Sequence, residues 1–224
     1  MKNLSTTTSV AIQLLETAIS VMEKEAPFQN GEENDVLSTL KDAYKQIVLK
    51  VNQTSATSTP QDKTINVYTD GACKGNPGPG GFGVVIERNG ARKEFSKGYR
   101  HTTNNRMELM AVLFALHSLI ESNSIQRDAK IVITSDSKYV TNAFQQKWIE
   151  KWKNNDFSTI QNPDLWKLVS EKADKLNEMG VNLEFTWIKG HAGHPQNELC
   201  DKLAVNASCS ANLLVDKKYE SLNN

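Results

Sequence analysis

Residues 65–99 read INVYTDGACKGNPGPGGFGVVIERNGARKEFSKGY, and this stretch decides the fold class of the chain. It begins with Ile65–Thr69, a short alternation of apolar and polar residues that is typical of a half-buried strand. Two further strand-like runs, Phe82–Arg88 and Ala91–Tyr99, flank Asn89-Gly90, a dipeptide that strongly favours a tight hairpin turn. The sequence therefore predicts a domain that begins with three strands, the last two forming a β-hairpin.

Helix-like and strand-like patterns alternate after residue 99. Thr103–Glu121 is predicted as a helix and Ile131–Thr134 as a buried strand, while Ser137–Lys153 favours one broken helix or two short ones. The remaining predicted elements are a helix, a strand and a last helix, at Asp164–Met179, Leu183–Ile188 and Asn197–Ala207. Gly180 follows the first of these helices in the position that favours a left-handed C-cap. This order indicates an α/β sheet layered with helices.

The composition differs before this domain. Residues 52–64 read NQTSATSTPQDKT, a small and polar stretch that has little to bury and is typical of a linker. Two helical stripes precede it: Ile12, Leu15, Ile19 and Met22, then Val36, Leu40, Ala43, Ile47 and Val51. We therefore expect a helical hairpin at 1–51, a flexible linker at 52–63, the α/β domain at 64–207 and a tail at 208–224.

Charge and cysteine content narrow the class of protein. Lys+Arg 26 balances Asp+Glu 26, so the 224-residue chain shows no global positive charge; this excludes little, because a nucleic-acid site needs basic residues only along its binding surface. Cys73, Cys200 and Cys209 lack any CxxC spacing, which argues against a disulfide framework or a zinc site. No apolar run approaches the roughly 20 residues of a membrane helix. We expect a soluble cytoplasmic protein with no membrane partner.

Two carboxylates stand at the ends of predicted strands. Asp70 follows Ile65–Thr69, and Asp136 follows the strand-like run that ends at Ser135. Open α/β sheets place their ligands at the carboxyl ends of strands, and adjacent strands would bring two such carboxylates close together. They would repel one another unless a divalent cation lay between them. The alternative for each aspartate alone is a turn or a helix cap.

Two further residues are candidates for chemistry. Glu108 lies near the start of a helix, where it is either a surface residue favoured by the helix dipole or a side chain directed at the strand ends. His191 lies on a glycine-flanked loop, where an exposed imidazole suits proton transfer near neutral pH. Zinc binding by His191 and His194 is a weaker alternative, because no further ligand is spaced to complete a tetrahedron.

Four stretches together resemble the type 1 ribonuclease H family over roughly Thr64 to Ala207. They are YTDGACKGNPGPGGFG (68–83), TTNNRMELMA (102–111), SDSKYV (135–140) and KGHAGHPQNELCDKLA (189–204). The resemblance implies a mixed five-stranded sheet with helices on both faces, preceded here by the helical hairpin. It also implies an endonuclease that cuts the RNA strand of RNA/DNA hybrids, leaving 5′-phosphate and 3′-hydroxyl ends.

The resemblance also implies the site. The family's metal-binding carboxylates fall on Asp70, Glu108, Asp136 and Asp201, and its catalytic-loop histidine falls on His191. Two Mg²⁺ ions are implied, with Mn²⁺ as a substitute. Asp70 would bridge both ions, Glu108 and Asp136 would hold the ion on the nucleophile side, and Asp201 would hold the other. His191 would deliver a proton or assist product release.

Recognition of the hybrid is implied by a second set of residues. Asn76, Asn104 and Asn105 match family positions that line the minor groove, where the 2′-hydroxyl distinguishes RNA from DNA. Thr103 and Asn76 match a pocket for a DNA-strand phosphate, and their alternative roles are N-cap and turn. Two tryptophans would either stack on DNA sugars or belong to the core: Trp148 and Trp152.

Two departures from the family pattern qualify these expectations. The segment 145–163, QQKWIEKWKNNDFSTIQNP, is less basic than the helix-and-loop handle of many relatives, which predicts weaker hybrid binding with a shallower salt dependence. Residues 1–60 carry five Lys against seven Asp and Glu, so they do not resemble a hybrid-binding module. We expect a monomeric catalytic domain and a hairpin that self-associates or binds a protein partner.

Two other functions would use parts of the same pattern. A DNA-cutting relative, such as a transposase or a Holliday-junction resolvase, would share the carboxylates but would not need the asparagines that read a 2′-hydroxyl. An inactive hybrid-binding protein would keep the fold, but intact carboxylates without a metal would only repel phosphate.

Overall fold

The computed structural model describes residues 63–122 and 124–223, together with Ile19, Lys41, Asp42, Tyr44 and Lys45. The chain divides into two units, Met1–Thr59 and Pro60–Asn224, and nearly all described residues belong to the second. The predicted hairpin over 1–51 lies outside the described residues, except for the five isolated positions, which are helical. The predicted linker over 52–63 also lies outside them, except for Lys63.

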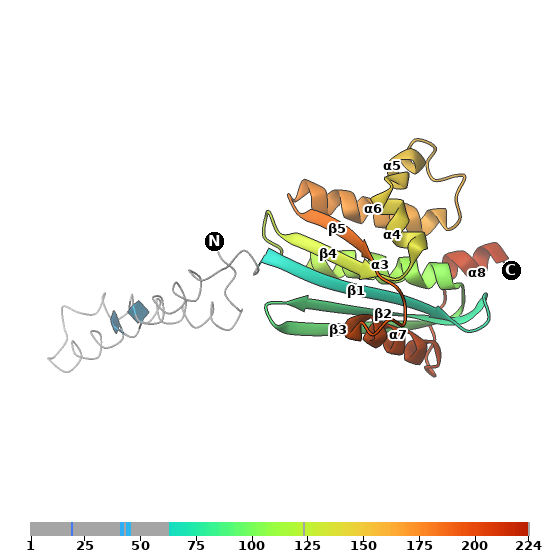
Figure 1. Cartoon of the computed structure of the whole chain (residues 1–224), viewed down its shortest axis with the longest axis horizontal. Helices are drawn as coiled ribbons and strands as arrows, with labels where there is room; N and C mark the ends of the chain where they lie inside the picture. Colours follow the sequence, from blue (N-terminus) through green and yellow to red (C-terminus); the bar gives the residue numbers. More distant parts are fainter. Residues whose placement is uncertain (1–18, 20–40, 43, 46–62, 123, 224) are drawn as a thin grey trace. The chain divides into compact units, whose positions relative to one another are not determined.

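The second unit is built on one mixed sheet of five strands (Figure 1). The strands are β1 (Thr64–Cys73), β2 (Gly78–Arg88), β3 (Ala91–Thr102), β4 (Lys130–Ser135) and β5 (Asn182–Trp187). Their order is β3-β2-β1-β4-β5, antiparallel from β3 to β1 and parallel from β1 to β5. The predicted mixed five-stranded sheet is confirmed, and β1 is its central strand.

Helices cover both faces of this sheet, as predicted (Figure 1). They are α3 (Asn104–Glu121), α4 (Lys138–Gln145), α5 (Trp148–Lys153), α6 (Pro163–Glu178), α7 (Pro195–Ser208) and α8 (Lys217–Asn223). Helix α3 packs on β1 and β2 beside α6, whereas α7 packs on β1, β2 and β3. The segment predicted as one broken or two short helices is two, α4 and α5, separated at Lys147, whose backbone is left-handed with φ 55°.

The sequence of β2 explains how the two layers fit. Side chains alternate between the faces of a strand, so Phe82 and Val84 lie on one face and Gly81 and Gly83 on the other. Phe82 and Val84 are buried in the main apolar core with the side chains of α3. A Cβ at Gly83 would overlap the carbonyl oxygen of Cys200 in α7. The glycines therefore let α7 pack directly against the strand backbone.

The prediction that the first strand ends at Thr69 is wrong. Strand β1 continues to Cys73 because β2 begins already at Gly78 and pairs with it antiparallel as far as Cys73↔Gly80. Asp70 therefore lies inside a strand, opposite Gly83. Within the glycine-rich stretch 71–83, only residues 74–77 lie outside the two strands.

The chain after α7 is part of this unit. Leu214 forms a bridge to Tyr99, with backbone hydrogen bonds to Gly98 and Arg100 at the edge of β3. Helix α8 follows, and sequence patterns did not predict it. No helix among the described residues is long and apolar enough to span a membrane.

Candidate active site

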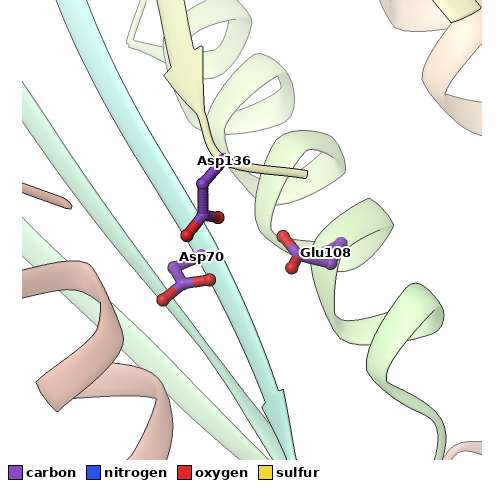
Figure 2. A group of neighbouring side chains, drawn as sticks. All are labelled: Asp70, Glu108 and Asp136. Carbon is purple, nitrogen blue, oxygen red and sulfur yellow. The ribbon is translucent and has the colours of Figure 1, made fainter. Parts of the chain in front are cut away.

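Three carboxylates from three separate elements meet beside the central strand β1, at the point where β4 ends (Figure 2). Asp70 comes from β1, Asp136 directly follows β4, and Glu108 lies in the first turns of α3. One oxygen of each lies within 4.8 Å of the others. Figure 2 shows the side chains directed toward one another, so Glu108 faces the strands and is not a surface residue.

Strand register and glycines bring these carboxylates together. Tyr68 pairs with Thr134 in the parallel ladder, so Asp70 and Asp136, each two residues further, leave adjacent strands at the same level. A Cβ at Gly71 would overlap the backbone nitrogen of Glu108, and its absence lets α3 approach β1. A Cβ at Gly190 would overlap Oδ2 of Asp136. The loop before α7 therefore passes directly beside the carboxylate of Asp136.

Burial and mutual repulsion raise the pKa values of this cluster. Burial, followed by the charge of Asp136, raises the pKa of Asp70 to about 7, although the amide of Gly71 donates to its Oδ1 at 2.8 Å. Burial, then the charges of Asp70 and Asp136, raise the pKa of Glu108 well above its usual value. Oε2 of Glu108 is buried without a hydrogen-bond partner among the described residues.

This arrangement fits a divalent cation. Hard cations such as Mg²⁺ and Ca²⁺ prefer oxygen ligands, and carboxylates supply them here from three directions. A cation would offset the repulsion that raises these pKa values and would give Glu108 Oε2 a partner. The residues present therefore suit a metal centre at Asp70, Glu108 and Asp136.

The structure places the other two candidate catalytic residues nearby. Asp201, half-buried in α7, lies outside the three-carboxylate cluster, but its charge contributes to the raised pKa of Asp70. His191 is exposed on the loop between β5 and α7, where it adopts a left-handed backbone with φ 51° beside Gly190. Within the described part of the chain, no group of three potential metal ligands includes His191 or His194.

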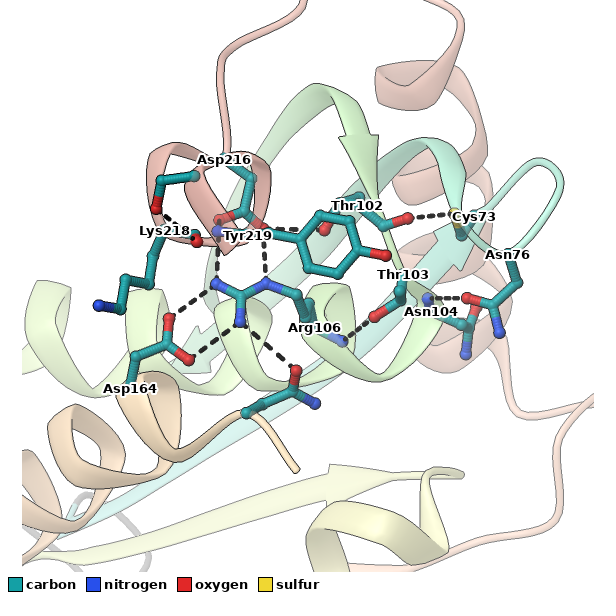
Figure 3. Close-up of polar contacts among 12 residues, drawn as sticks. Cys73, Asn76, Thr102, Thr103, Asn104, Arg106, Asp164, Asp216, Lys218 and Tyr219 are labelled. Atoms are coloured by element: carbon teal, nitrogen blue, oxygen red, sulfur yellow. Dashed lines mark hydrogen bonds and ion pairs between the residues drawn. The ribbon is translucent and has the colours of Figure 1, made fainter. Parts of the chain in front are cut away.

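The predicted hybrid-contacting residues gather at the start of α3 (Figure 3). Thr103 is the N-cap, and its hydroxyl accepts a hydrogen bond from the amide of Arg106 at 3.4 Å. The amide of Asn104 donates to Oδ1 of Asn76, on the exposed β1–β2 loop, at 2.9 Å. Asn105 is half-buried in the first turn. Thr103 therefore caps α3, and the hydrogen bond from Asn104 holds Asn76 beside the start of this helix.

Trp148 and Trp152 take part in core packing. Both are half-buried against the main core, and their ring centroids are 6.1 Å apart. Trp152 also lies 5.0 Å from the fully buried Trp166, ring centroid to ring centroid. In the same region Lys153 is paired with Asp174 at 2.8 Å, so one of the few cations of the handle is already engaged within the protein.

Sequence patterns missed two residues that hold Asp136. The indole nitrogen of Trp187 donates to the backbone oxygen of Asp136 at 2.9 Å, and Nδ2 of Asn197 donates to Oδ2 of Asp136 at 3.4 Å. Trp187 is 38% exposed, with Lys138 Nζ 4.7 Å from its ring centroid. One available signal was the position of Asn197 four residues before Asp201, on the same face of a helix.

A buried ion-pair network was also missed (Figure 3). The guanidinium of Arg106 donates to both oxygens of Asp216 at 2.6 and 2.9 Å and to both oxygens of Asp164 at 3.0 and 2.8 Å. Thr102 donates to the same Asp216 at 2.9 Å. Arg106 stands between the hybrid-contacting set and Glu108, so the network fixes the start of α3 to α6 and to the C-terminal segment.

Comparisons with known proteins agree with this geometry. The RNase H family model matches residues 62–209. A curated ribonuclease H of Desulforamulus reducens is 48% identical over 159 residues, covering 69% of this chain and 93% of that protein. One of Pseudoalteromonas atlantica is 44% identical over 163 residues, covering 70% of this chain and 99% of that protein.

Solved structures give the same result. The crystal structure of LC9-RNase H1, a type 1 RNase H with the type 2 active-site motif, is 31% identical with a TM-score of 0.56, over 74% of this chain and 82% of that chain. LC11-RNase H1 in complex with an RNA/DNA hybrid is 29% identical with a TM-score of 0.50, over 64% of this chain and 95% of that chain. Because the family model matches more than half of the chain and the curated relatives are covered almost end to end, the chain belongs to the RNase H family of enzymes.

Proposed function

We propose that this enzyme cuts the RNA strand of RNA/DNA hybrids internally by two-metal-ion catalysis, leaving 5′-phosphate and 3′-hydroxyl ends. The observation that carries the proposal is the buried cluster of Asp70, Glu108 and Asp136, with its mutual repulsion and the unpartnered oxygen of Glu108. Support for the substrate comes from the similar LC11-RNase H1, whose structure contains an RNA/DNA hybrid.

Mg²⁺ is the proposed cofactor, and Mn²⁺ would substitute for it. When bound, two such ions supply the activation of the attacking water and the stabilisation of the departing oxygen. Asp70 would help to hold both ions, since burial and then the charges of Asp136 and Asp201 raise its pKa. Glu108 and Asp136 would hold the ion on the nucleophile side, and Asp201 would hold the second.

The loop before α7 is proposed to serve proton transfer. His191 is exposed, and Gly190 packs against Asp136, so the loop backbone is anchored next to the carboxylates. An imidazole at this place can give a proton to the departing 3′-oxygen or assist product release. This role predicts that His191→Ala lowers kcat more than it raises KM.

Recognition of the hybrid is proposed to lie at the start of α3. Asn76, Asn104 and Asn105 carry amides that donate and accept, as contacts to a 2′-hydroxyl require. Thr103 with Asn76 would bind a phosphate of the DNA strand. Because Trp148 and Trp152 already pack on the core, only their exposed edges would contact the DNA sugars; the two tryptophans are therefore the weakest members of the proposed set.

The test is cleavage of one labelled sequence presented as RNA/DNA, RNA/RNA, DNA/DNA and single-stranded RNA, with Mg²⁺ or with EDTA. The expected result is cutting of the RNA in the hybrid alone, abolished by EDTA, with product ends identified by their response to phosphatase and to ligase. Asp70→Asn is expected to keep hybrid binding and lose cleavage. Cleavage of DNA would favour a resolvase-like activity, and hybrid binding without any cleavage would favour an inactive binding protein.

Residues 1–60 are proposed to form a self-associating or protein-binding hairpin, while the catalytic domain acts as a monomer. The support is the acidic balance of this segment, with five Lys against seven Asp and Glu, and its two apolar helical stripes. Light scattering of the full chain and of a variant starting at residue 60 would show whether the segment alone changes the oligomeric state.

A further inference from the structure

Asn197 lies in the first turn of α7 and is buried, with 3% of its surface exposed. Its Nδ2 donates a hydrogen bond to Oδ2 of Asp136 at 3.4 Å. A carboxylate can only accept hydrogen bonds, so the nitrogen of the amide, and not its oxygen, faces Asp136. The side chain of Asn197 thereby restrains one of the three clustered carboxylates.

The other end of the same amide lacks a partner. Oδ1 of Asn197 is buried, and no described residue donates a hydrogen bond to it. An amide oxygen withdrawn from water requires a donor, because burying it without one is unfavourable. Oε2 of Glu108, in the same carboxylate site, is in the same state. Among the described residues, these two are not the only buried side-chain oxygens without a partner, since Thr69 and Ser170 also have one each, but both belong to side chains of this site.

Asn197 has a second acidic neighbour, on its own helix. Residues four apart on a helix share a face, so Asn197 and Asp201 project from α7 on the same side. Asp201 contributes to the raised pKa of Asp70, so this face of α7 is turned toward the cluster. Asn197 therefore contacts Asp136 through a hydrogen bond and lies one helical turn before Asp201 in α7.

We propose that Asn197 is a positioning residue for metal binding. Its amide nitrogen fixes the orientation of the Asp136 carboxylate, and its amide oxygen accepts a hydrogen bond from a water molecule at the metal site. The inference rests on the proposed metal-dependent function and adds a residue to it. Hydrogen-bond partners of ligating carboxylates typically change metal affinity or activity by about 10- to 100-fold when removed.

The test compares Asn197→Ala with a matched control, Gln196→Ala, in the full chain. Gln196 is the neighbouring amide on the same helical turn, but its Nε2 is directed at Glu87 at 3.5 Å. Mn²⁺ binding to the protein without hybrid is measured by electron paramagnetic resonance, and the Mg²⁺ concentration for half-maximal cleavage is measured with hybrid. Asn197→Ala is expected to weaken both by about 10- to 100-fold, with KM for the hybrid nearly unchanged and Gln196→Ala nearly equal to the parent.

The outcomes separate this inference from the proposed function. A parent protein that neither binds Mn²⁺ nor cleaves the hybrid would remove the proposed function itself. A parent that does both, with Asn197→Ala equal to it in Mn²⁺ affinity, would overturn the positioning role. A lower melting temperature in EDTA without a change in ion affinity would also overturn it, since that is the signature of a purely structural side chain. If Asn197→Ala does not fold, Asn197→Ser keeps a polar first-turn residue that is too short to reach Asp136, and the same loss is expected.

Discussion

Replacing Arg106 by methionine is expected to destabilise the folded domain by about 3–5 kcal/mol, the range for removing one partner of a buried ion pair. Arg106 is 2% exposed and Asp216 is 3% exposed, so the change leaves a carboxylate buried without its cation. Methionine keeps an unbranched apolar stem like that of arginine and lacks the guanidinium, which limits the cavity contribution relative to a change to alanine. The side chain of Asp164 is 20% exposed, so Asp164→Asn is expected to cost only about 1 kcal/mol.

Urea denaturation of the full chain, followed by tryptophan fluorescence, measures this effect. The chain has four tryptophans, all after residue 60, so the signal reports on the catalytic domain. The double variant Arg106→Met with Asp216→Asn is expected to be more stable than Arg106→Met alone, because it removes the charge left unpaired. A double variant less stable than the single one, with the two losses simply adding, would refute the buried-charge explanation.

Three further predictions concern pH, metal and backbone packing. Burial alone would raise the pKa of Asp164, but hydrogen bonds and charge from Arg106 lower it below the ordinary carboxyl value. The ionised Asp164 therefore contributes its full stability above the ordinary carboxyl pKa, and this stability is lost as the pH falls toward the lower pKa of the folded protein. Thermal melts at acid pH of the parent and of Asp164→Asn would show this loss. The pKa of Asp70 is raised to about 7, so in EDTA the parent protein is expected to lose stability as the pH rises from about 4 to 7. The free energy of unfolding of Asp70→Asn should exceed that of the parent by roughly 1–3 kcal/mol at pH 8 and should equal it near pH 4. Equal stability of the two proteins at pH 8 would contradict the repulsion. Gly71→Ala should abolish most cleavage, because the added Cβ would overlap the backbone of Glu108. Gly90→Ala is the control, since its Cβ would have no atom within 4 Å and only the left-handed φ of 75° would be strained. This control is expected to lose about 1 kcal/mol of stability and to keep its kcat.

Local chemistry in the sequence was sufficient for several elements. Asn89-Gly90 predicts the hairpin turn, and both residues adopt the positive φ, 51° and 75°, that such a turn requires. Gly180, with φ 76°, follows α6 as predicted. These features depend on residues within a few positions of one another, so the local sequence is sufficient to predict them. The four motifs also identify the family without any structure.

Tertiary structure alone decided how the site is assembled. The sequence left Glu108 undecided between solvent and strand ends, and the answer depends on Gly71, in another element, which lets α3 approach β1. It could not show that Asp70 lies inside a strand, because that follows from pairing with β2.

The most distant partners were invisible for the same reason. Arg106 and Asp216 are 110 residues apart, and Asn197 and Asp136 are 61 apart. A hydrogen bond between such residues leaves no local periodicity, because only the packing of α3, α7 and the C-terminal segment around the sheet brings the atoms together. Sequence patterns thus determined the elements and the identity of the acidic residues, whereas packing determined which side chains hold them in place.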